Sequence, residues 1–144
     1  MSAMFKTYRH LICRYPKISL YQERRLIKQA QGDSKAKKDE LVLRHIGFII
    51  FRIRKIAYPI YCTRYGEDIL SQAIFIFYDK IKTYDLRYKD KHGNSKPVRF
   101  SSYIWKRIDG FITDYLKKEI ISIDNLNLTY AKKVVKWSHE TDNA

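Results

Sequence analysis

The chain has 144 residues, and 45% of them are hydrophobic, which argues against disorder throughout its length. This length is enough for one domain with a core of its own. The 29 Lys and Arg residues outnumber the 15 Asp and Glu residues, for a formal net charge of +14. That surplus favours a polyanionic partner, either nucleic acid or an anionic membrane surface. A lysine-rich proteome is the alternative explanation of the charge.

Several features predict a cytoplasmic protein without a membrane partner. Cys13 and Cys62 are far apart in the sequence and match no zinc-binding spacing, which suits a reducing compartment. The N-terminus has no long apolar region of the kind found in signal peptides. The most apolar run, residues 46–53, is interrupted by Arg52 and is too short to span a bilayer. Nucleic acid is therefore the expected polyanion.

Apolar residues recur at intervals of three and four along most of the chain, which is typical of helices. The first expected helix covers residues 20–31, where Ser19 and Gln22 have the spacing of a capping box. The second covers residues 35–58, and Pro59 is expected to end or bend it.

The third expected helix covers residues 66–84 and opens with Glu67 and Asp68, because acidic residues are stabilised in the first turn of a helix. Residues 85–98 follow as a polar, basic loop that contains Gly, Asn and Pro. The fourth expected helix covers residues 98–119 and has a continuous apolar stripe.

These elements predict an all-α domain, a compact bundle of about four main helices with a basic loop before the last long one. Residues 1–18 are expected to form an N-terminal extension, and residues 19–119 the domain. Residues 120–144 are expected to be a weakly specified tail. Within it, residues 126–137 have the apolar spacing of a short helix, which would either dock on a partner or cover the core of this chain.

Cationic and aromatic residues are concentrated around the predicted loop and the start of the helix after it. Cations bind phosphates and aromatic rings stack on unpaired bases, so this combination suits single-stranded nucleic acid. The residues are Tyr84, Arg87, Tyr88, Arg99, Phe100, Tyr103, Trp105, Lys106 and Arg107. Phe100 and Tyr103 also lie on the apolar stripe, and for Phe100 we favour a place in the core. Lys106 and Arg107 fit a solvated surface equally well.

No arrangement of residues indicates catalysis, and we predict that the protein is not an enzyme and has no cofactor. The sequence has no phosphate-binding glycine loop and no nucleophile elbow. The four histidines are scattered, and His45 falls on an apolar stripe, where we expect a core histidine with its polar atoms satisfied. Asp109 and Asp114 are expected to be solvated surface acids.

Three segments, in order along the chain, resemble region two of the bacterial RNA polymerase sigma factors. Residues 67–85, EDILSQAIFIFYDKIKTYD, are similar to the segment that binds polymerase. Residues 99–116, RFSSYIWKRIDGFITDYL, resemble the segment that melts and reads the minus-ten promoter element. Residues 26–58 resemble the helical lead-in, and the whole similarity covers about residues 19–118. The pattern RI-x-G-x-x-x-D-x-L at residues 107–116 is closest to flagellar and sporulation-type sigma factors.

The resemblance implies two interfaces. Asp68, Ser71 and Gln72 would contact the clamp helices of the largest subunit of core RNA polymerase. The non-template strand of promoter DNA would be held by Tyr84, Arg87, Phe100, Ser102 and Tyr103, and Tyr103 would stack on a flipped adenine.

Some positions depart from the family. Lys106 and Arg107 replace two adjacent tryptophans that wedge the upstream edge of the bubble in housekeeping sigma factors, and Trp105 stands just before them. Ile74 and Ile76 replace a polar residue and a glycine. Weaker melting and an altered polymerase contact are therefore expected.

Only 25 residues follow Glu119, which is too few for region four, the helix-turn-helix that reads the minus-thirty-five element. A phage-type or split sigma factor with a separate region-four-like or co-activator protein is the explanation we favour. The alternatives are a factor that reads the minus-ten element alone and a degenerate relative that occupies polymerase without initiating.

Two other functions fit the sequence. A basic helical module of a phage or mobile element could bind nucleic acid without polymerase, and charge reversal at Asp68 would then leave function intact. A polymerase-binding inhibitor would need Asp68 but would tolerate loss of Tyr103, Arg87 and Arg99.

Overall fold

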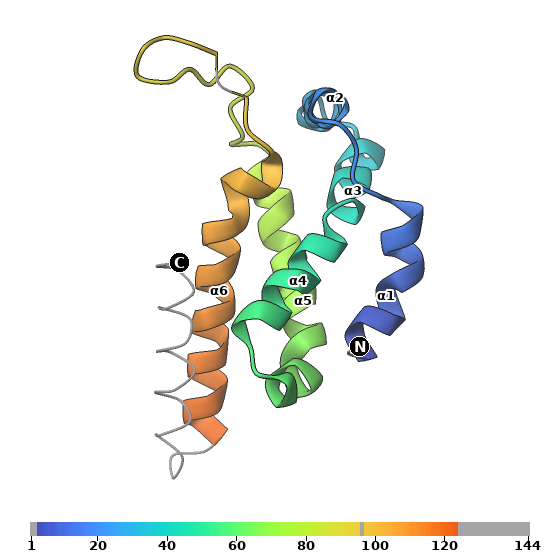
Figure 1. Cartoon of the computed structure of the whole chain (residues 1–144), viewed down its shortest axis with the longest axis vertical. Helices are drawn as coiled ribbons and strands as arrows, with labels where there is room; N and C mark the ends of the chain where they lie inside the picture. Colours follow the sequence, from blue (N-terminus) through green and yellow to red (C-terminus); the bar gives the residue numbers. More distant parts are fainter. Residues whose placement is uncertain (1–2, 96, 124–144) are drawn as a thin grey trace.

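The computed structural model describes residues 3–95 and 97–123, and this part of the protein is all-α (Figure 1). Its helices are α1 (Ala3–Arg14), α2 (Leu20–Gln31), α3 (Lys35–Leu43), α4 (Ile46–Ile56), α5 (Pro59–Ile81) and α6 (Phe100–Ile123). α4, α5 and α6 pack on one another, α2 packs on α3, and α1 lies against α4 and α5. None of the helices described is long and apolar enough to cross a bilayer. The segment predicted at residues 126–137 lies outside the described residues.

The predicted start of α2 is confirmed. The backbone N–H of Gln22 donates to Ser19 Oγ at 3.2 Å, and the backbone N–H of Ser19 donates to Gln22 Oε1 at 3.1 Å. This reciprocal pair is a capping box, and it satisfies two N–H groups that a helix start leaves without partners.

The prediction of one helix over residues 35–58 is wrong, because the chain turns between α3 and α4 at His45. The His45 ring donates from Nδ1 to the carbonyl of Leu41 at 2.7 Å, so that this carbonyl is bonded to a side chain. The His45 backbone N–H donates instead to Val42, three residues back, at 2.9 Å. The helix tightens and ends where a side chain competes with the backbone for the same acceptor.

α5 begins at Pro59 rather than near residue 66. Tyr58 has extended dihedral angles (φ −60°, ψ 152°), and Pro59 occupies the first turn, where a missing N–H costs nothing. Glu67 and Asp68 therefore lie inside a helix of 23 residues and do not open it, so the role predicted for them at a helix start is wrong.

α1 falls within the segment that was expected to be an extension. Tyr8 and Ile12 on one side of α1 are partly buried against the core. Gly47 at the start of α4 faces this side of α1, and a Cβ built there would lie 3.4 Å from Ile12 Cγ2, which is close van der Waals contact.

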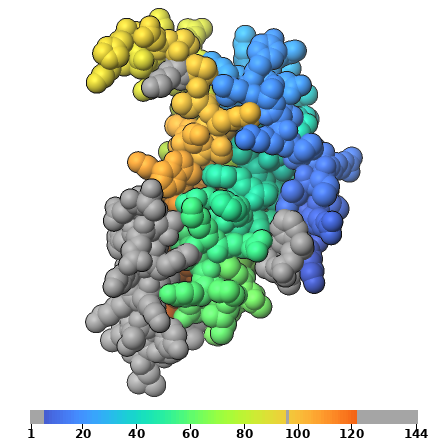
Figure 2. All heavy atoms as spheres, viewed as in Figure 1, coloured from blue at the N-terminus to red at the C-terminus, as the bar shows by residue number. Residues whose placement is uncertain are grey.

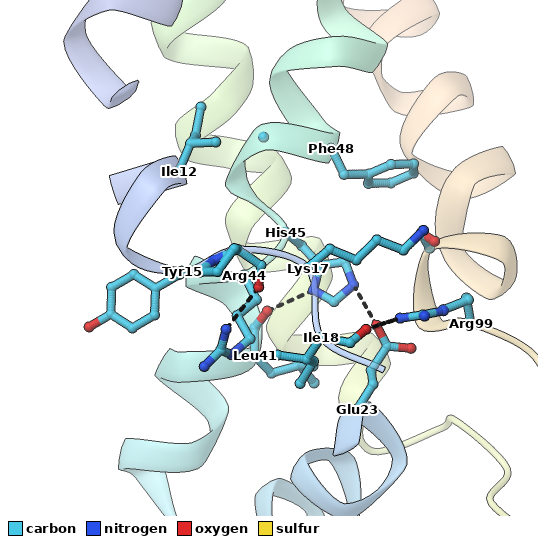
Figure 3. A pocket seen from close by; sticks show the side chains of 13 residues that line it. Ile12, Tyr15, Lys17, Ile18, Glu23, Leu41, Arg44, His45, Phe48 and Arg99 are labelled. Carbon is cyan, nitrogen blue, oxygen red and sulfur yellow. Dashed lines mark hydrogen bonds and ion pairs between the residues drawn. The ribbon is translucent and has the colours of Figure 1, made fainter. Parts of the chain in front are cut away.

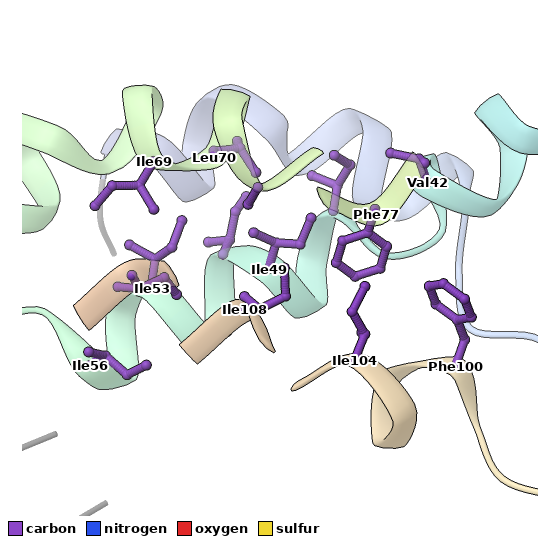
Figure 4. Close-up of a cluster of buried hydrophobic side chains, with 14 of the residues drawn as sticks. Val42, Ile49, Ile53, Ile56, Ile69, Leu70, Phe77, Phe100, Ile104 and Ile108 are labelled. Carbon is purple, nitrogen blue, oxygen red and sulfur yellow. The ribbon is translucent and has the colours of Figure 1, made fainter. Parts of the chain in front are cut away.

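The core runs along the contacts of α4, α5 and α6 (Figure 4). Ile49, Phe77, Phe100 and Ile104 are fully buried or nearly so, which confirms the place expected for Phe100. His45 is also buried, as expected, with its ring centroid 5.4 Å from that of Phe77 and 5.5 Å from that of Phe100. The loop between α5 and α6 projects from one end of the molecule (Figure 2), and it turns at Gly93, which has a positive φ of 81°.

Candidate nucleic-acid interface

The junction between α5 and α6 is held in place by side chains of α2. Gln31 Nε2 donates to the carbonyls of Ile81 at 2.9 Å and of Tyr84 at 2.8 Å. Arg24 Nη2 donates to the carbonyl of Leu86 at 2.6 Å. These carbonyls lie at or just after the C-terminal end of α5, where carbonyls need partners from outside the helix. α2 therefore fixes the path of the chain as it leaves α5.

Glu23, also from α2, holds the start of α6 (Figure 3). Its Oε2 accepts a 3.0 Å hydrogen bond from the backbone N–H of Phe100, the first residue of that helix. Its Oε1 lies 3.6 Å from His45 Nε2 and 3.7 Å from Arg99 Nη1. A carboxylate here is favoured by both the helix dipole and the adjacent cation. A pocket of about 300 Å³ lies beside this cluster, with α1 and α4 contributing to its lining.

The ionisation of Glu23 is expected to make stability depend on pH. Burial raises the pKa of Glu23, but the His45 ring, the Phe100 N–H and Arg99 together bring it below the ordinary value of 4.5. A lowered folded-state pKa stabilises the protein above pH 4.5, and this contribution is lost as the pH falls through the folded-state pKa. Glu23→Gln is expected to reduce the free energy of unfolding by about 1 to 2 kcal/mol at pH 7 and by less at pH 3.5.

Urea unfolding of both proteins at the two pH values measures this difference. Glu67→Gln is the matched control, because Glu67 is exposed in the middle of α5. If the free energy of unfolding fell by the same amount between pH 7 and pH 3.5 in wild type and in Glu23→Gln, this would contradict an ionised Glu23 at the start of α6.

Tyr103 is an exposed aromatic residue whose ring is fixed by its neighbours. Its side chain is 37% exposed, and its hydroxyl lies 2.7 Å from Thr83 Oγ1. The Tyr84 ring stands edge-on to it at a centroid distance of 5.4 Å, and the Phe100 ring lies 5.9 Å away. A ring held in this way can accept a stacked base without losing much further rotamer freedom.

Ser102, Lys106 and Arg107 are exposed around Tyr103 on the outer side of α6. The spacing from Tyr103 to Lys106 and Arg107 is three and four residues, so these side chains lie on one helix face. Trp105 is partly buried instead, with Arg52 Cζ 5.5 Å and Lys106 Nζ 5.6 Å from its ring centroid. Trp105 therefore does not share the exposed face of Tyr103.

The other predicted DNA-binding residues are divided between surface and interior. Arg87 and Tyr88 are exposed on the projecting loop. Tyr84 and Phe100 are buried, and their rings pack against the ring of Tyr103. Arg99 donates from Nη1 to the carbonyl of Ile18 at 2.6 Å, so its guanidinium is engaged within the protein. The hydroxyl of Tyr84 donates to the carbonyl of Val98, and burial raises the pKa of Tyr84.

Asp109 is not the solvated acid that the sequence suggested. Its side chain is only 3% exposed and pairs with Arg52 of α4, whose Nε donates to Asp109 Oδ1 at 2.8 Å. A second hydrogen bond joins Arg52 Nη2 to Asp109 Oδ2, so the pair is bidentate. This pair joins α6 to α4, and the same Arg52 guanidinium lies over the ring of Trp105.

The predicted polymerase-binding residues lie on one exposed face of α5, on a different helix from Tyr103. Asp68, Ser71 and Gln72 are all exposed and follow one another at helical spacing. Phe75 continues the same face and is 70% exposed, and Asp79 lies one turn beyond it. We call these five residues the α5 face. Its two charged residues are Asp68 and Asp79, and the exposed cations Arg64 and Lys82 lie at its two ends.

Sequence reasoning missed Glu23, Arg24, Gln31 and Phe75. The first three act on residues at least 50 positions away, and nothing local in the sequence indicates such partners. Phe75 carried a usable signal, because it lies seven residues after Asp68 and therefore on the same helix face.

No group of three or more His, Cys, Asp or Glu residues in the described part of the chain could hold a metal ion. Comparison with known proteins assigns no relative: no protein-family model matches the sequence, and no significant match was found among curated proteins or solved structures.

Proposed function

We propose that the protein is a sigma-like transcription initiation factor that binds core RNA polymerase and holds the non-template strand of the minus-ten promoter element. The observation that carries the proposal is the setting of Tyr103, an exposed ring fixed by Thr83 and Tyr84 beside two exposed cations. Such a setting is what a flipped base and its neighbouring phosphates require.

The free energies of duplex opening and of base stacking explain why the polymerase is needed. Opening duplex DNA costs about 1.4 kcal/mol per base-pair step. A base stacked on an aromatic ring returns about 1 to 3 kcal/mol. Tyr103 could therefore capture one base but could not open a bubble alone, and core polymerase must supply the remaining free energy. Flipping is cheapest at weakly paired, flexible steps, which favours A+T-rich elements.

The α5 face supports the polymerase part of the proposal. It places an exposed aromatic ring, Phe75, among the acidic and polar residues Asp68, Gln72 and Asp79. Binding hot spots are rich in aromatic residues surrounded by polar contacts that exclude water. Asp68 and Asp79 would pair with basic groups on the partner.

The test is purification of the tagged full-length protein from its host, with co-purifying proteins identified by mass spectrometry. Core polymerase subunits in the eluate are the expected result, and any further protein would be a candidate promoter-binding partner. Absence of polymerase at low salt would overturn the proposal in favour of a nucleic-acid-binding module that acts alone. Polymerase retention without any effect of Tyr103→Ala on transcription would indicate an inhibitor.

Substitutions on the α5 face are expected to separate polymerase binding from DNA binding. Phe75→Ala or Asp68→Lys should reduce the affinity for core polymerase by about tenfold or more, because each removes a central contact of the face. Phe51→Ala is the matched control, since Phe51 is also a well-exposed phenylalanine (58%) but lies on α4. Affinity is measured by surface plasmon resonance on immobilised core enzyme. Equal effects of Phe75→Ala and Phe51→Ala would argue against this face as the contact.

A further inference from the structure

Gly110 lies in the middle of α6 and has no evident role within the fold. It is exposed, and apart from its chain neighbours and the backbone of its own helix, no atom of the described residues would lie within 4 Å of a Cβ built there. Two other glycines differ from it: Gly47 packs against the Ile12 side chain, and Gly93 has a positive φ. A glycine inside a helix destabilises it relative to alanine, because it loses more backbone entropy on folding.

The residues around Gly110 share its helix face. Lys106 and Arg107 precede it by four and three residues, Tyr103 by seven, and Asp114 follows by four. All of these are exposed. The missing side chain thus leaves bare helix backbone between a cationic, aromatic stretch on one side and an acidic residue on the other.

We propose that Gly110 is the place where the sugar–phosphate backbone of the bound strand lies directly against α6, an inference that rests on the proposed function. Glycine allows a ligand to approach the helix backbone more closely than any other residue. Lys106 and Arg107 bind the adjacent phosphates, and Tyr103 stacks on a base further along the strand. Asp114 repels phosphate, so the contact ends there and the strand leaves the helix between Gly110 and Asp114.

Charge distinguishes this occupant from a second protein helix. A small residue also lets two helices pack closely, but the contact would bury the charges of Lys106 and Arg107. Charged residues are depleted from the centres of protein interfaces, because their desolvation is unfavourable. A polyanionic strand instead gains from both cations.

The test uses two substitutions whose effects on folding and on binding have opposite signs. Gly110→Ala and Gly110→Leu should both raise Tm by about 2 to 5 °C, since alanine and leucine favour helices more than glycine does. The probe is a fluorescently labelled, A+T-rich single-stranded oligonucleotide bound to the complex of the full-length protein with host core polymerase. Its dissociation constant should rise about threefold for Gly110→Ala and about tenfold for Gly110→Leu, in order of side-chain size.

Two further readouts identify the contact as one with the backbone of DNA. The slope of log affinity against log salt should fall by about 0.7 in Gly110→Leu for each phosphate displaced. The loss should be the same for A+T-rich and G+C-rich strands, because sugar and phosphate carry no direct sequence information. Gln29→Leu is the control for an added apolar side chain, since Gln29 is exposed on α2.

The outcomes separate this inference from the function on which it rests. More stable Gly110 variants that bind the strand like wild type would overturn the backbone contact and leave the sigma-like function in place. Weaker binding to core polymerase with unchanged binding of DNA would also overturn it and would indicate a helix–helix contact. If the wild-type complex fails to form or retains no oligonucleotide, the proposed function fails, and the inference fails with it.

Discussion

Replacing Asp109 with alanine is expected to lower the free energy of unfolding by about 3 to 5 kcal/mol. The substitution leaves the guanidinium of Arg52 buried against α6, at 11% side-chain exposure, without the carboxylate that accepts its two hydrogen bonds. An uncompensated buried charge is one of the few single changes with an effect of this size. Small domains are stable by only about 5 to 15 kcal/mol, so this loss is a large fraction of the total stability.

A second variant keeps this expectation testable if Asp109→Ala does not fold. Arg52→Met combined with Asp109→Leu replaces the pair with apolar residues and should be about as stable as wild type, because no charge remains to be desolvated. Asp114→Ala is the control, since Asp114 is an exposed acid on the same helix. Urea unfolding measures all four proteins. A change of less than about 1 kcal/mol in Asp109→Ala would mean that solvent reaches Arg52 and that the pair does not hold α6 against α4.

Replacing Tyr103 with alanine is expected to reduce promoter opening by about 10- to 100-fold, which corresponds to the loss of one stacked base. The effect on stability should be small, because the ring is more than one-third exposed. Opening is followed by the fluorescence of 2-aminopurine placed in the minus-ten element, with host core polymerase present. The variant should bind core polymerase normally, since Tyr103 lies on a different helix from the α5 face.

Tyr103→Phe separates the role of the ring from that of the hydroxyl. The phenylalanine keeps a face for stacking and the edge-on contact with Tyr84, but it loses the contact of the hydroxyl with Thr83. Opening should therefore fall by less than about fivefold, because a single neutral hydrogen bond contributes about 1 kcal/mol or less at an exposed site. Equal losses in Tyr103→Ala and Tyr103→Phe would show that the hydroxyl, not the ring, carries the function.

Helices were predictable from the sequence where local chemistry determines them. The capping box at Ser19 and the apolar stripe of the last helix needed only neighbouring residues. The break at His45 was not predictable, because it depends on a side chain bonding to the carbonyl of Leu41 in preference to the helix backbone. Pro59 was recognised as a boundary, but whether it ends one helix or begins the next depends on the dihedral angles of Tyr58.

Residues of the candidate site were predictable by type and only in part by role. Charge and aromatic content placed Tyr103, Lys106 and Arg107 in one segment, and the structure places them on one face. Arg99 and Tyr84 are also a cation and an aromatic residue of this segment. Their side chains instead donate hydrogen bonds to the carbonyls of Ile18 and Val98 within the protein. The burial of Asp109 depends on Arg52, 57 residues earlier, and no local pattern indicates such a pairing.

Side chains of α2 anchor the chain on both sides of the α5–α6 loop, and this allows the loop to vary in length. Gln31 and Arg24 secure the chain as it leaves α5, and Glu23 secures the start of α6. Chain inserted between these anchors, within residues 89–95, need not displace Tyr103. Doubling the length of a flexible loop costs only about 0.6 kcal/mol in closure entropy. The tip of the loop is therefore free to lengthen, shorten or carry a label while the residues at its base keep their positions.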